Sequence, residues 1–148
     1  MLALSHALAG AAIAASAPNP ATALTLALLS HPLLDLFPHW DFNTRNNGHR
    51  PKGTIIAISL IDAALGFAAG IILFGSQVSP PLLLATMFVA QLPDWLEAPY
   101  HIFDWHFPPF TWVKQFQHTF HYKLASPWGV VTQVAFVLIL IFSSETPI

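Results

Sequence analysis

Long apolar stretches dominate this chain, and short segments rich in proline, glycine and asparagine interrupt them. Apolar stretches of this length predict helices, and the interruptions mark where the helices end. The five predicted helices cover Leu2–Ser16, Ala21–Phe37, Thr54–Gly75, Pro81–Glu97 and Pro127–Phe142. The third is long enough to span hydrocarbon, whereas several others are near the short limit of about 17 residues.

The composition points to a membrane protein. Hydrophobic residues make up 55% of the 148 residues and charged residues only 8%, whereas soluble domains contain about 25% charged residues. We therefore predict an all-α, polytopic membrane bundle of about five helices, forming a single domain over residues 1–148, with membrane lipid as a partner. The net charge of −2 and the lack of a basic run argue against nucleic-acid binding.

The cations predict an orientation. If successive helices alternate in direction, the N-terminus and the loops at 42–53 and 100–126 share one side, and this side carries every Lys and Arg. The positive-inside rule then places the N-terminus in the cytoplasm. The cations and tryptophans assigned to this side are Arg45, Arg50, Lys52, Lys114, Lys123, Trp40, Trp95, Trp105, Trp112 and Trp128. The first helix is expected to be retained, because it lacks the positive start of a signal peptide.

An internal repeat fits this topology. The stretch Leu4–Ala14 is similar to Leu60–Gly70, and the match aligns His6 with Asp62. Each copy also carries small residues four apart, which let two helices approach closely. One arrangement compatible with this repeat is two similar helical hairpins followed by a C-terminal helix.

Three carboxylates lie within or at the ends of the predicted helices: Asp35, Asp62 and Asp94. An aspartate at the centre of a membrane helix costs about 2.5–3.5 kcal/mol on insertion scales, so it usually faces a bundle interior or a cavity. The alternative role is a purely structural hydrogen bond between helices.

Histidines accompany these carboxylates. His31 lies four residues before Asp35 and so shares its helix face, and Pro38 ends that helix so that His39 can fold back toward Asp35. His118 and His121 are three residues apart, which would align them on one helical turn. His49, His101 and His106 lie in predicted loops without a ligand partner and are left out of the candidate site.

The candidate metal ligands are His6, Asp35, His39, Asp62, Asp94, His118 and His121. Without cysteine, any metal must bind imidazole and carboxylate, which favours zinc, with manganese or iron as alternatives. Seven candidates exceed the four ligands of a closed structural site, so the surplus favours an open site or two metals. His39 or His118 would complete the ligand shell or act as a general base.

The stretches SHPLLDLFPHWDF, QLPDWLEAPYH and FQHTFHYKLASPWGVVTQ resemble small multi-pass bacterial membrane proteins. More distantly, they are similar to the membrane-bound, LexA-regulated family of metal-dependent hydrolases. This resemblance implies metal-binding roles for His6, Asp35, His39, Asp94 and His121, with His118 as a further candidate. It also implies a location in the bacterial cytoplasmic membrane.

Together with the predicted metal site, this resemblance implies hydrolysis of an ester or phosphoester, of a small-molecule or lipid-linked substrate, at headgroup depth. Two other classes stay open. An ion or proton transport component would use the intramembrane carboxylates and His6 as a relay. A non-catalytic membrane protein would use the same residues as a structural polar or metal site.

Overall fold

The computed structural model describes residues 1–42 and 50–144, which fold into α-helices without a β-strand. The helices in this part of the chain are α1 (Ala3–Ser16), α2 (Pro20–Asp35), α3 (Lys52–Phe74), α4 (Pro80–Ala90), α5 (Leu92–Ile102), α6 (Phe110–Phe120) and α7 (Trp128–Ser144). The all-helical prediction is confirmed. The described residues contain seven helices rather than about five. Arg45 and His49 lie outside the described residues.

One extra helix arises because the predicted fourth helix is two helices, α4 and α5. The first ends at Ala90 and the second begins at Leu92, with Gln91 between them. Pro93 has no amide hydrogen to donate to the preceding turn, but it is well tolerated in the first turn of a new helix. The chain therefore breaks at Gln91, and Asp94 lies in the first turn of α5. The other extra helix, α6, lies in a predicted loop.

Helix α1 is the centre of the fold and contacts α2, α3, α4 and α7. Small residues make these contacts close. A Cβ atom added to Gly10 would lie 2.6 Å from the backbone oxygen of Thr86 on α4, and one added to Gly66 on α3 would lie 2.7 Å from the Cα of Leu4. The small-residue spacing of the two repeat segments thus corresponds to real helix–helix contacts.

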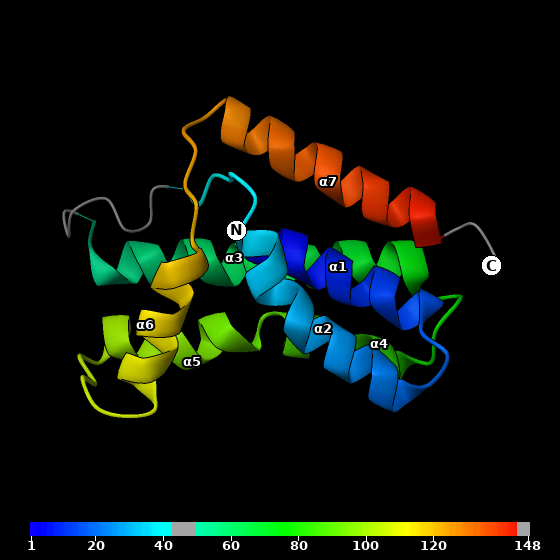
Figure 1. Cartoon of the computed structure of the whole chain (residues 1–148), viewed down its shortest axis with the longest axis horizontal. Helices are drawn as coiled ribbons and strands as arrows, with labels where there is room; N and C mark the ends of the chain where they lie inside the picture. The colour runs from blue at the N-terminus through cyan, green and yellow to red at the C-terminus, as the bar shows by residue number, and fades with distance from the viewer. Residues whose placement is uncertain (43–49, 145–148) are drawn as a thin grey trace.

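The molecule has two regions, which Figure 1 shows side by side. The first, called the bundle, contains α1, α2, α4, α7 and residues 63–74 of α3. The second, called the cap, contains residues 52–61 of α3 together with α5 and α6, which pack on each other. The turns at residues 17–19 and 75–79 lie at the end of the bundle far from the cap.

By length and composition, α3 is the one helix in the described part of the chain that could cross a membrane. Helices α1, α4 and α7 are apolar but shorter, so the prediction of several membrane spans is not confirmed. Large apolar side chains are nevertheless exposed along three helices. They include Leu26, Leu29 and Leu33 on α2, Ile61, Leu65 and Ile72 on α3, and Val134, Ile139 and Phe142 on α7.

Candidate metal centre

Six candidate ligands meet where the bundle joins the cap. His6 lies in the second turn of α1, His31 and Asp35 end α2, and Asp94 begins α5. His39 and His121 come from the segments that follow α2 and α6. The structure therefore brings together residues from both predicted hairpins and from the late histidine segment.

Asp35 is the centre of this cluster. Its Oδ1 lies 3.4 Å from His6 Nε2 and 3.7 Å from His39 Nε2. Its Oδ2 lies 3.5 Å from His31 Nε2 and 3.4 Å from His121 Nδ1. These separations exceed the 2.7–3.2 Å usual for N–H···O hydrogen bonds. They match instead the separation of about 3.3 Å between two ligand atoms on a tetrahedral zinc ion.

Two of the histidines are oriented by backbone carbonyls. The Nδ1–H group of His31 donates to the oxygen of Ala90 at 2.7 Å, and that of His39 donates to the oxygen of Phe37 at 2.8 Å. Because a carbonyl can only accept, each bond fixes the hydrogen on Nδ1 and leaves a lone pair on Nε2, and in His39 that lone pair faces Nε2 of His121 at 3.1 Å. Metal-binding histidines are typically oriented in this way.

Several nitrogens of the cluster are buried without a hydrogen-bond partner in the described part of the chain. They are both ring nitrogens of His6, Nε2 of His31 and Nδ1 of His121. A buried polar atom left unsatisfied costs about 1–3 kcal/mol, and three of these four nitrogens, those of His6 Nε2, His31 Nε2 and His121 Nδ1, face Asp35, which is an unusual concentration. Coordination of a cation would satisfy the lone pairs that face Asp35, so the donor set fits a divalent metal.

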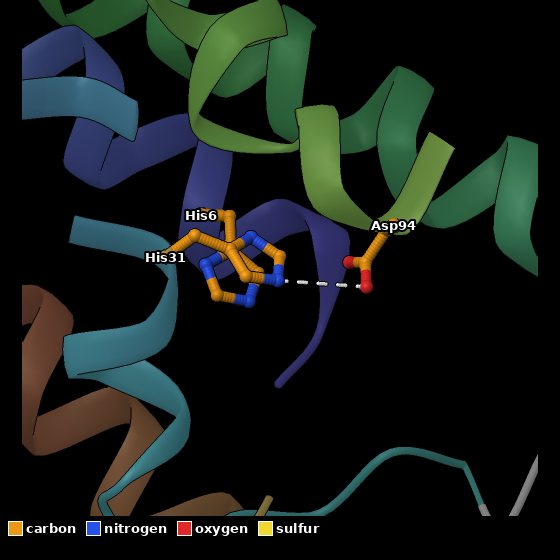
Figure 2. A group of neighbouring side chains, drawn as sticks. All are labelled: His6, His31 and Asp94. Atoms are coloured by element: carbon orange, nitrogen blue, oxygen red, sulfur yellow. Dashed lines mark ion pairs between the residues drawn. The ribbon is translucent and has the colours of Figure 1, made fainter. Parts of the chain in front are cut away.

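Figure 2 shows how His6 and His31 face Asp94 from the bundle side. The two imidazole rings stack with centroids 3.9 Å apart and planes at 14°. The Nε2 atom of His31 lies 3.6 Å from Oδ1 of Asp94. Stacking thus aligns two imidazoles from different helices toward one carboxylate on α5.

Backbone pairing holds His121 beside Asp35. The backbone amide of Tyr122 donates to the backbone carbonyl oxygen of Asp35 at 3.2 Å. The amide of His39 donates to the carbonyl oxygen of Tyr122 at 3.1 Å, and the amide of Leu124 donates to that of His39 at 2.8 Å. This pairing requires an extended chain, and the backbone leaves the helix at His121 with φ −83° and ψ 104°. The prediction that His118 and His121 share a helical turn is therefore wrong.

The electrostatics beside this paired segment favour a neutral imidazole at His39. Burial lowers the pKa of His39 to about 4, so its ring is uncharged at pH 7 and able to bind a metal. Asp41 contacts Lys123 at 2.5 Å and lies 3.9 Å from His121 Nε2. Burial alone would raise the pKa of Asp41, but the hydrogen bond and charge of Lys123 outweigh it and lower that pKa.

Helix α7 packs against the paired backbone segments that follow α2 and α6. Gln133 is 3% exposed; its Nε2 donates to the Trp40 oxygen at 2.8 Å, and its Oε1 accepts from the Leu2 amide at 3.1 Å. The Thr132 hydroxyl donates to the Pro38 oxygen. A Cβ atom on Gly129 would lie 2.3 Å from the Leu124 oxygen. These contacts link α7 to both of the paired chain segments, residues 38–40 and Leu124.

Two predicted ligands lie elsewhere. Asp62 accepts hydrogen bonds from the amides of Ala3 at 2.6 Å and Leu4 at 3.4 Å. It therefore caps the N-terminus of α1, whose own N-cap residue offers no side-chain acceptor. His118 is exposed on α6. Neither joins the two groups of potential ligands in the described residues, which are His6–His31–Asp94 and Asp35–His39–His121.

His31 is the candidate ligand that the sequence prediction left out. Its spacing from Asp35 indicates a shared helix face, but not that His6 of α1 would stack on it. The amino group of Met1 also contacts Asp35.

A cavity of about 520 Å³ opens beside the cluster, between α3 and α5. Asp94 and His121 line it, so two of the candidate ligands are accessible from it. Its wall combines apolar and polar side chains, including Ile55, Ile58, Arg50, Lys52, Glu97 and His101. His101, expected in a loop without a partner, lies on α5 and bonds to Glu97 at 2.8 Å.

Comparison of the chain with models of known protein families, with curated proteins and with solved structures found no match.

Proposed function

We propose that this protein is a membrane-bound, metal-dependent hydrolase that cleaves an ester or phosphoester. The observation that carries the proposal is the set of buried imidazole nitrogens that surround Asp35 without hydrogen-bond partners in the described residues. Zinc is the proposed ion, because four imidazoles and two carboxylates form a nitrogen-rich donor set. The resemblance to membrane-bound metal-dependent hydrolases points the same way.

The cavity supports an amphiphilic, lipid-linked substrate. Asp94 and His121 would contact the reacting group, Arg50 and Lys52 would attract an anionic headgroup, and the isoleucines of α3 would contact an apolar chain. A bound divalent ion supplies Lewis-acid activation of water and of the substrate. The proposed location is the bacterial cytoplasmic membrane, with the N-terminus in the cytoplasm and several helices embedded, which the exposed apolar side chains of α2, α3 and α7 support.

The test is hydrolysis of p-nitrophenyl esters and bis-p-nitrophenyl phosphate by purified protein in detergent micelles. We expect activity that EDTA removes and Zn²⁺ restores. Asp35→Asn should lower kcat/KM by at least ~100-fold, because it removes the central ligand. His118→Ala is the matched control and should retain activity, since that side chain is exposed outside the cluster.

Two outcomes would contradict the proposal. Stoichiometric metal without hydrolysis of either substrate would indicate a structural metal site. A wild-type protein that binds no metal would indicate that the polar residues serve helix packing or ion transport instead.

A further inference from the structure

The candidate ligands form two sets that meet at one residue. The first set is His6, His31 and Asp94, and the second is Asp35, His39 and His121. Within each set, all ligand atoms lie within 4.8 Å of one another. Each set is therefore compact enough to surround one ion.

Asp35 belongs to the second set but is equally close to the first. Its Oδ1, which also accepts a hydrogen bond from the Met1 amino group, faces His6 of the first set and His39 of the second, at 3.4 and 3.7 Å. Its Oδ2 faces His31 of the first set and His121 of the second, at 3.5 and 3.4 Å. A carboxylate with each oxygen at ligand distance from both sets is placed to bridge two ions.

The number of donors also exceeds what one ion uses. A zinc ion takes four ligands in a closed site, and a catalytic zinc takes three protein ligands and an open position. With one Asp35 oxygen assigned to each set, the first set has four ligands and the second has three. His121 of the second set lines the cavity, as Asp94 of the first set does, so the open position of the three-ligand ion can be reached from the cavity.

We propose that the cluster binds two divalent ions bridged by Asp35, a closed one at His6–His31–Asp94 and an open one at His39–His121. The proposal rests on the metal-dependent function proposed above and specifies its site. Paired ions of this kind are about 3.5–4 Å apart in hydrolytic enzymes, where they stabilise the attacking and leaving oxygens together.

The experiment is metal analysis of the full chain, purified in detergent, loaded with Zn²⁺ and passed through a desalting column. We expect about two ions per wild-type chain and about two in the control His118→Ala. Asp94→Asn and His39→Gln should each retain about one ion, and Asp35→Asn should lose both. Circular dichroism and gel filtration establish that each variant is folded.

Electron paramagnetic resonance of the Mn²⁺-loaded wild type provides a measurement that needs no variant. Two ions bridged by Asp35 should give an exchange-coupled signal, and Asp94→Asn should convert it to that of an isolated ion. One zinc ion per wild-type chain would overturn the two-ion site while leaving the proposed hydrolase intact. Loss of both ions from folded Asp94→Asn would overturn the division into two sets, and a metal-free wild type would overturn both proposals.

Discussion

The bundle and the cap hold the same cluster in opposite ways. In the bundle, small residues bring α1 close to its neighbours, and the side chains of His6, His31 and Asp35 are at most 2% exposed. The cap is built from short helices and aromatic contacts around a cavity, and the side chain of its ligand Asp94 is 39% exposed. The bundle thus provides tightly packed candidate ligands, whereas the cap provides a more exposed one, Asp94.

This division suggests how stability and reactivity are separated. Close packing in the bundle fixes imidazoles whose buried ring nitrogens lack hydrogen bonds in the described residues, which costs free energy of folding. A well-packed scaffold is needed to hold such side chains in place. The cap closes one side of the cluster and leaves a cavity open beside it. Substitutions in the bundle should therefore act mainly on unfolding, and substitutions in the cap mainly on binding.

The largest effect on unfolding is expected from Gly10→Ala in the bundle. The new methyl group would lie 2.6 Å from the backbone oxygen of Thr86, which cannot move without shifting α4. We expect a loss of about 1–3 kcal/mol in the free energy of unfolding, measured by denaturation in detergent micelles. The control is Gly53→Ala in the cap, where a Cβ atom meets nothing within 4 Å.

Gly53→Ala should leave stability unchanged or raise it by up to about 1 kcal/mol, because alanine favours helix. Equal effects of the two substitutions would show that the bundle is not more tightly packed than the cap.

A smaller effect, on metal affinity, is expected from Asp41→Asn at the boundary between the two regions. Asp41 holds Lys123 and faces His121, so its loss should let the His121 segment move. Loss of such a supporting residue typically weakens metal binding about 10–100-fold. Competition with a chromophoric chelator measures this change. Lys123→Gln should reproduce it, and an unchanged affinity in both variants would mean that backbone pairing alone positions His121.

The same two regions differ in how far the sequence predicts them. Apolar stretches predicted both boundaries of α1, α2 and α3 to within two residues, because a long run of apolar residues is a strong signal for a helix. In the cap, α5 and α6 carry mixed polar and aromatic residues, and the break before α5, next to Pro93, was not predicted.

The site shows the same limit. Spacing along one helix was enough to relate His31 to Asp35, but the stacking of His6 on His31 depends on how α1 packs against α2. Asp62 was assigned as a ligand because it is a carboxylate in an apolar helix. Its actual role follows from α1 beginning beside it, which no local pattern in α3 encodes.

A still smaller effect is expected from Arg50→Gln at the cavity. If Arg50 attracts an anionic headgroup, its loss should raise KM for the phosphodiester about tenfold and leave kcat and the hydrolysis of the neutral ester unchanged. Lys114→Gln is the control, since Lys114 lies over the Tyr100 ring rather than in the cavity wall. Equal changes for charged and neutral substrates would contradict recognition of the anion by Arg50.

The smallest effect should come from Asp104→Asn, which removes the 2.6 Å contact with Lys52 on the surface of the cap. The hydrogen bond and charge of Lys52 lower the pKa of Asp104. The stability from this pair is therefore present above the ordinary aspartate pKa and is lost as the pH falls through the lowered value.

Both groups are exposed, and such pairs contribute little because water and salt screen them. We expect a melting temperature within error of the wild type at pH 7 and unchanged metal stoichiometry. A clear loss of bound metal in Asp104→Asn would mean that this surface pair helps to hold the cap rigid. The bundle and the cap would then differ in composition but not in rigidity.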